Sequence, residues 1–190
     1  MNSKFRASPV LRASTVADLV RFAIAVAAFC SVNAIAQTTV AKPVCNGGEY
    51  RQFDFWIGDW DTYDLEDKDP SKVIARNHVD PILEGCVLRE DYDQFDGHHG
   101  QSFTIWDATR KVWHQSWVTN RGELLVLEGT RTGSRITFEG DSINAKGVHQ
   151  RTRVFWEPQG ADVRETATVS EDGGKTFKPL FDIVFRKHKS

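Results

Sequence analysis

Charged and polar side chains stand inside several stretches of this sequence that otherwise alternate like β-strands. Arg151 and Arg153 are two residues apart, so an extended chain turns both guanidinium groups to one face, where they could hold an anionic group. The same alternation puts Gln115 beside Trp117 on one face of 112–119. We predict an interior that fixes the polar end of a ligand. Its candidate residues are Arg153, Arg151, Gln115, Trp117, Glu90 and Arg76.

The same charges allow a second interpretation. Charged residues that alternate along strands often form ion pairs across the solvent-exposed face of a sheet, and Arg76, Glu90 and Glu165 fit that pattern as well. Both faces of 112–119 and of 148–157 mix polar and apolar residues. Alternation alone therefore leaves the direction of each face open.

The histidines do not form a catalytic or metal-binding pattern. His114 lies between Trp113 and Trp117 without a nucleophile and an orienting carboxylate in sequence, which favours a structural role. His98 and His99 are adjacent, and adjacent side chains on an extended chain point apart, so they do not share one ion. The sequence predicts no catalytic residue, no metal site and no cofactor, and it favours a role other than catalysis.

The elements that must position these residues are β-strands. About ten short stretches with a two-residue period are separated by Gly, Asp and Asn, and no window keeps a helical period for three turns. Tight turns such as Asn120–Gly122 favour pairing of consecutive strands, and closing such a sheet removes both exposed edges. We predict one all-β, up-and-down antiparallel barrel. The expected strands are 55–64, 72–80, 86–94, 101–107, 112–119, 123–131, 134–140, 148–157, 162–170 and 177–187.

The first expected strand carries an aromatic sequence that runs from Phe53 to Asp61. Alternation would place Trp56, Gly58 and Trp60 on one face, with Trp60 packed at the base of the barrel and the acids directed to water. A short helical turn just before this strand, within 48–53, would close one end of the barrel.

Residues 1–36 are typical of a secretory signal peptide. Basic residues precede an apolar run from Phe22 to Phe29, and Ala34-Ile35-Ala36 is a small-x-small cleavage sequence. The apolar run is too short for the ~20 residues of a membrane span. We therefore predict export to the periplasm or the medium, without membrane insertion.

The predicted mature chain has a leader and barrel-end plug at 37–52 and a barrel domain at 53–190. Removing 1–36 takes four of the 24 basic residues and one of the 26 acidic ones, which leaves a net charge of −5. That balance disfavours nucleic acid as a partner. Cys45 and Cys86 both remain, and in an oxidising compartment such a pair most simply forms a disulfide.

One turn has a recognisable internal pattern, Ser170-Glu-Asp172-Gly-Gly174-Lys-Thr176-Phe177. It resembles the Asp-box hairpin of sialidases, in which Ser and Asp side chains bond the backbone amides of the turn. We predict a structural role for Ser170, Asp172 and Gly174, and no glycosidase activity.

Four stretches together resemble the bacterial exported DUF1579-type proteins of the lipocalin-like, or calycin, group. They are Phe53–Asp61, Ile82–Val87, Trp113–Trp117 and Ser170–Thr176. The resemblance implies a small antiparallel barrel with an internal cavity, in which Gly58 and Trp60 close the base. It implies no activity.

The leading hypothesis is an exported lipocalin-like barrel, a monomer or weak dimer, that binds a small, partly apolar ligand in an internal cavity. One alternative is an enzyme of the isomerase or cyclase type on the same scaffold. The other is a haem-binding barrel that resembles nitrobindin, with His149 as the axial ligand of the haem iron.

Overall fold

The computed structural model describes residues 45–144 and 146–189. The predicted signal peptide and residues 37–44 of the predicted leader lie outside these residues. Within the described ranges, no helix has both the length and the apolar character needed to cross a membrane.

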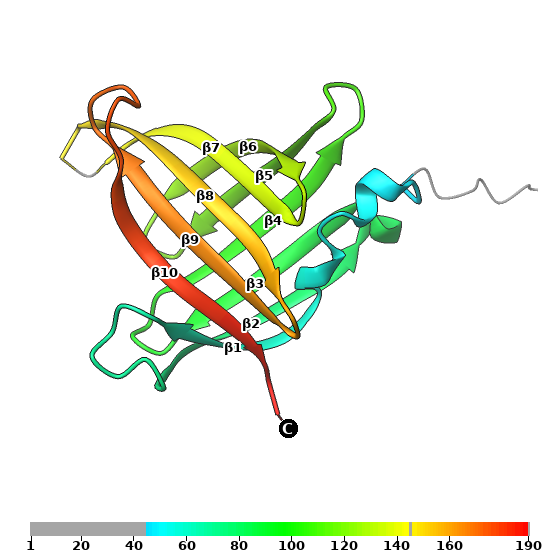
Figure 1. Ribbon diagram of the computed structural model, residues 1–190, viewed down its shortest axis with the longest axis horizontal. Helices are drawn as coiled ribbons and strands as arrows, with labels where there is room; N and C mark the ends of the chain where they lie inside the picture. Colours follow the sequence, from blue (N-terminus) through cyan, green and yellow to red (C-terminus); the bar gives the residue numbers. More distant parts are fainter. Residues whose placement is uncertain (1–44, 145, 190) are drawn as a thin grey trace, which may run out of the picture. The chain divides into compact units, whose positions relative to one another are not determined.

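Ten antiparallel strands close into one barrel, which confirms the predicted all-β, up-and-down fold (Figure 1). Each strand pairs with its neighbours in sequence, and β1 closes the barrel by pairing with β10. The strands are β1 (Gly58–Asp64), β2 (Val73–Ile82), β3 (Val87–Gln94), β4 (His99–Asp107), β5 (Val112–Thr119), β6 (Leu124–Thr132), β7 (Arg135–Ile143), β8 (His149–Gln159), β9 (Asp162–Ser170) and β10 (Lys178–Lys187).

The first strand begins later than the sequence predicts. Residues Asp54–Trp56 form a 3-10 turn, η3, and β1 begins only at Gly58. The turn is closed by a hydrogen bond from the Trp56 amide to the Phe53 carbonyl, 3.1 Å long. It buries the side chains of Phe53 and Trp56 completely. An extended chain would have directed these two aromatic rings to opposite faces.

A plug of aromatic side chains fills the end of the barrel beneath this turn. The Trp56 and Trp156 ring centroids are 4.2 Å apart, and those of Phe53 and Trp56 are 5.2 Å apart. Trp60 is fully buried beside them, and its indole N–H donates to the Trp56 carbonyl over 2.8 Å. The predicted helical turn is also present as η2 (Gly48–Arg51).

A disulfide joins Cys45 to Cys86, as predicted. Cys86 follows the short turn η4 (Leu83–Gly85), which connects β2 to β3. The bridge therefore ties the segment before η2 to the wall of the barrel. The Arg51 side chain adds a hydrogen bond to the Gly85 carbonyl at the same place.

The β9–β10 hairpin has the internal hydrogen bonds of the Asp-box pattern. The Gly174 amide donates to the Ser170 hydroxyl over 2.8 Å, and the Thr176 amide donates to Asp172 Oδ1 over 2.9 Å. The Thr176 hydroxyl donates to Asp172 Oδ2 over 2.6 Å. These bonds lower the pKa of Asp172.

Candidate functional site

A buried carboxyl group on the inner wall is the centre of the candidate site. Glu90 lies on β3, opposite Val79 of β2 and Ser102 of β4. The Asn77 amide donates to Glu90 Oε1 over 3.0 Å, and the Ser102 hydroxyl donates to Glu90 Oε2 over 2.8 Å. Asn77, Glu90 and Ser102 are all buried. Three adjacent strands thus build one polar cluster inside the barrel.

Two oxygens at this level have no hydrogen-bond partner within the described residues. They are Asn77 Oδ1 and Thr62 Oγ1, and both side chains are buried. The Asn77 amide nitrogen is already directed to Glu90, so its oxygen is left to accept from another donor. A buried acceptor without a donor costs about 1–3 kcal/mol. Each oxygen is free to accept a hydrogen bond from a donor outside the described residues.

A second carboxyl group enters the interior from the far wall. Glu165 lies on β9 midway between the buried residues Val163 and Ala167 and shares their strand face. Its cross-strand partner Trp156 is also buried, so Glu165 points inward. Only β2, β1 and β10 separate β3 from β9 on one side of the closed barrel. The Glu90 and Glu165 side chains therefore approach the interior from nearly opposite walls.

Burial changes the acidity of both groups. It raises the pKa of Glu90 to about 7, against the lowering effect of the hydrogen bonds from Ser102 and Asn77. Burial also raises the pKa of Glu165 well above its ordinary value, and the Glu90 charge raises it further. Desolvation penalises the charged form of a carboxyl group that has no counter-ion. The interior is thus an environment that disfavours isolated negative charge.

Aromatic side chains border the carboxyl cluster on the side away from the plug. Tyr92 follows Glu90 by two residues on the same face of β3, and its ring lies edge-on to Trp117 with centroids 6.0 Å apart. The Trp117 ring covers Gly100, where an added Cβ would come within 2.3 Å of the indole. Glycine at this position lets the indole lie flat against β4.

The interior is filled at the plug and more open above it. Trp56, Trp60 and Trp156 are fully buried. Farther along the strands, the inward-facing Trp117 and Glu165 keep part of their surface accessible to solvent. Solvent therefore reaches these two side chains, unlike those of the plug.

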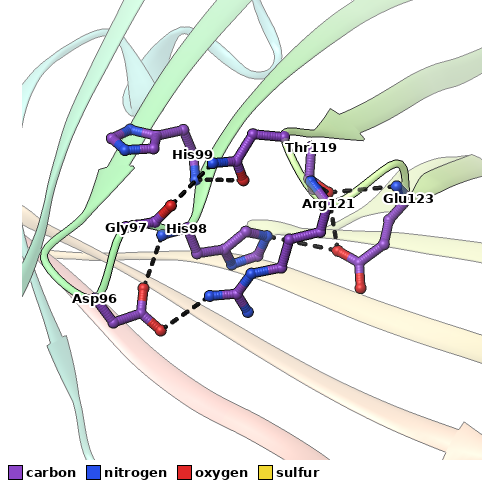
Figure 2. A network of polar contacts seen from close by, with 8 residues as sticks. Asp96, Gly97, His98, His99, Thr119, Arg121 and Glu123 are labelled. Carbon is purple, nitrogen blue, oxygen red and sulfur yellow. Dashed lines mark hydrogen bonds and ion pairs between the residues drawn. The ribbon is translucent and has the colours of Figure 1, made fainter.

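Two turns hold the rim above Trp117 (Figure 2). The His98 amide donates to Asp96 Oδ1 over 2.8 Å, and Arg121 donates to Asp96 Oδ2 over 3.2 Å. The imidazole of His98 lies edge-on to Trp117, with 6.5 Å between ring centroids, and 3.5 Å from a Glu123 carboxylate oxygen. The β3–β4 and β5–β6 turns are thereby joined at the mouth of the barrel.

The structure divides the predicted site residues between the two faces of the sheet. Glu90, Gln115 and Trp117 point inward, and the Gln115 amide donates to the Thr104 hydroxyl over 3.1 Å inside the barrel. The three predicted arginines lie outside, where each pairs with an acid: Arg76 with Asp61, Arg151 with Asp141 and Arg153 with Glu139. The arginines therefore match the interpretation in which they form ion pairs on the outer face of the sheet.

The histidine of the haem hypothesis lies on the outer face as well. His149 is exposed at the start of β8, and Thr152 and Val154 point inward on the alternate positions. Its ring is therefore directed away from the interior. His98 and His99 also diverge, since His99 lies 2.9 Å from Asp93 on the outer surface.

Sequence reasoning missed the neutral part of the cluster. Asn77, Ser102 and Thr62 are small polar residues that also occur on solvated strand faces, so their types give no signal alone. A signal was present in the parity of β2, where Asn77 alternates with the apolar residues Ala75 and Val79. An amide between two buried apolar positions indicates an inward polar group.

No protein-family model matches the chain, and no curated protein matches its sequence. The resemblance to DUF1579-type proteins stays a prediction, and the function is argued from the geometry of the interior.

Proposed function

We propose that this chain is an exported barrel that binds a small, partly apolar ligand in its interior. The polar end of the ligand lies against Glu90, Asn77 and Glu165, and its apolar part packs against Trp117 and Leu125. Leu125 of β6 is paired with Trp117, so the two side chains form a continuous apolar surface on the inner wall. Ligand sites of this kind are mostly apolar, with a few convergent polar groups.

One observation carries this proposal: Asn77 Oδ1 and Thr62 Oγ1 are buried at the level of the Glu90 cluster without a donor in the described residues. A barrel interior built only for stability would place apolar groups there, because an unsatisfied polar atom weakens the fold. A ligand that donates hydrogen bonds to these oxygens removes that penalty when it binds.

The proposal changes the predicted role of the arginines. A guanidinium pair for an anionic ligand requires Arg151 and Arg153 inside the barrel, and both are paired on the outer face. The inward-facing predicted residues, Glu90, Gln115 and Trp117, retain their role as ligand contacts.

Binding of the neutral dye Nile red tests whether the interior takes up a ligand. Two neighbouring positions on β6 provide a matched pair, because Leu125 points inward and Val126 is exposed on the outer face. The Leu125→Trp variant fills space beside Trp117, and we expect it to reduce dye affinity at least about tenfold. Val126→Trp adds the same indole outside and should leave dye affinity unchanged.

Dye affinities are compared once far-UV circular dichroism and thermal melts show that both variants are folded to the same extent. If Val126→Trp lowered dye binding and Leu125→Trp left it intact, the dye would bind on the outer surface, and the proposal would be refuted. Failure of the unsubstituted chain to bind the dye, or any ligand from an organic extract, would refute it as well.

A further inference from the structure

We propose that the polar end of the ligand is an organic cation, and that Glu90 and Glu165 bind its ammonium group. This inference rests on the proposed function and specifies the chemical class of the ligand. It follows from the distribution of charge between the two faces of the barrel, from an acceptor oxygen without a donor, and from the aromatic wall beside the carboxyl groups.

Many acids on the outer face of the barrel have cationic partners, whereas the inward-facing carboxyl groups do not. Asp80 pairs with Arg89 over 3.0 Å, and Asp182 pairs with Arg164. Within the described residues, no cationic group is among the causes that shift the pKa of Glu90 or Glu165. Inward-facing carboxylates without a counter-ion are costly, and a bound cation would supply one.

The side chain of Asn77 independently indicates a ligand that donates hydrogen bonds. It is 2 % exposed, and its amide nitrogen donates to Glu90 Oε1 over 3.0 Å. Its oxygen accepts no hydrogen bond from the described residues. A primary ammonium group has three N–H donors and no acceptor, so it can satisfy Asn77 Oδ1 and a carboxylate oxygen at once. A carboxylate ligand would leave this oxygen without a donor.

The aromatic wall also favours a cation. Tyr92 and Trp117 lie next to the Glu90 cluster, Tyr92 on the same strand face and Trp117 paired with Ser102. The faces of aromatic rings attract cations, with the largest effect for Trp. An ammonium group on a short apolar chain would place its charge at the carboxyl groups and its apolar part against these rings.

A metal ion fits the same cluster less well. No group of three or more His, Cys, Asp or Glu side chains suited to a metal ion occurs in residues 45–144 and 146–189. Calcium takes six to eight oxygen ligands, and zinc prefers nitrogen and sulfur. Two carboxyl groups on opposite walls, with indole and phenol rings between them and the rim, suit an organic cation.

The acidity of the cluster supports the assignment. Glu90 faces Asn77 from β2, Ser102 from β4 and Glu165 from β9, and Asp91 on its own strand raises its pKa slightly. Tyr92, the other titratable group nearby, has a raised pKa and stays neutral. With Glu90 at a pKa of about 7, a cation would favour the ionised carboxylate. Amine affinity should therefore fall as the pH is lowered through about 7.

Isothermal titration of the mature chain with three matched probes tests the inference. The probes are phenethylamine, 2-phenylethanol and phenylacetate, which share an aromatic group and a short chain but differ in charge. At about pH 8, where Glu90 is mostly ionised, we expect the amine to bind at least about tenfold more tightly than the alcohol. Phenylacetate should bind most weakly. Calcium chloride serves as the probe for a metal ion.

Two interior variants and one outer control assign the effect to the cluster. Glu90→Gln and Glu165→Gln each remove one charge at constant shape, and each should lower amine affinity about tenfold while leaving 2-phenylethanol unaffected. Asp91→Asn removes an exposed outer carboxylate on the same strand and should change neither. The two interior variants are independent, so a folding defect in one leaves the other informative.

The outcomes separate this inference from the proposed function. Equal binding of amine and alcohol, tighter binding of phenylacetate, or calcium binding without amine binding would overturn the cation assignment. So would the absence of amine binding in a chain that still binds Nile red. Loss of both amine and dye binding would overturn the proposed function itself.

Discussion

The barrel buries the carboxyl group of Glu90 away from water. Ionisation of this buried group weakens the fold. Only two hydrogen bonds, from Asn77 and Ser102, compensate for its burial. A glutamine or a leucine in its place would remove that penalty. A residue that opposes stability in this way is consistent with the proposed ligand contact.

The Glu90→Gln variant should be more stable than the unsubstituted chain at alkaline pH. The pKa of Glu90 is about 7 in the folded chain, above the ordinary value of 4.5. Between about pH 4.5 and about pH 7, the folded state binds more protons than the unfolded state. The free energy of unfolding therefore falls as the pH rises through this range and stays constant at higher pH. Glu90→Gln lacks this loss of stability, so its free energy of unfolding should exceed that of the unsubstituted chain by at most about 3 kcal/mol at pH 8.

Urea unfolding of both proteins at several pH values measures this difference. The two stabilities should converge near about pH 4 and separate through neutral pH. A constant difference across the whole range would show that Glu90 does not titrate in the folded barrel as described.

Trp60 and Asp59 are adjacent residues with opposite expected effects. Trp60 is 1 % exposed in the plug, and its ring is covered by the Lys187 ammonium 3.6 Å from the ring centroid. Trp60→Ala should lower the free energy of unfolding by about 3–5 kcal/mol. The Asp59 carboxylate is exposed and lies 2.6 Å from the exposed His78, so Asp59→Asn should change little. Denaturant unfolding that ranks them in reverse would contradict the plug assignment.

At this scale, the sequence predicted the types of residue in the site but not all their directions. Glu90, Gln115 and Trp117 face the interior, which is one of the two interpretations that the sequence left open. Arg151 and Arg153 share one face, as alternation requires, but that face is the outer one. The other face of β8 carries the polar residues Gln150 and Thr152 together with apolar residues, and this mixture hid its preference for the interior.

At the scale of elements, strand positions were predictable because the turns are marked by residues that tolerate positive φ. The strands 112–119 and 162–170 have the predicted bounds, and the bounds of the others differ by one to three residues. Among strand starts, the largest shift is at β1, where Phe53 and Trp56 pack into the barrel end at a 3-10 turn. Tertiary packing overrides local β-propensity there.

The β9–β10 hairpin should lose local order when its internal bonds are removed. Asp172 accepts hydrogen bonds from the amides of Lys175 and Thr176. In Asp172→Ala these amides should exchange with solvent faster, while amides of distant strands keep their protection. Hydrogen exchange followed by NMR measures this directly. Unchanged exchange in the hairpin would show that the turn is held by other contacts.

Removal of the disulfide should loosen the plug and lower stability. Cys45 and Cys86 are separated by 41 residues, and opening a loop of this length costs about 3–4 kcal/mol in the chain-entropy description. The double substitution Cys45→Ala, Cys86→Ala should lower the melting temperature and leave far-UV circular dichroism β-like. An unchanged melting temperature would mean that the bridge adds nothing to the plug.

At the scale of the whole barrel, the fold combines a closed, dry end with a polar, more open interior. The sheet has no exposed edge, since β1 pairs with β10. Tryptophan and phenylalanine fill the plug end, and carboxyl, amide and hydroxyl groups occur above it. The two ends of the barrel interior therefore differ in polarity.

Native mass spectrometry of the purified chain tests the central claim most directly. If the interior is a ligand site, the spectrum should contain a species heavier than the polypeptide by the mass of a small molecule. That species should disappear on organic extraction and be depleted in Leu125→Trp but not in Val126→Trp. A bound species that both variants retain equally, or a ligand-free chain that takes up no probe in titration, would contradict the account.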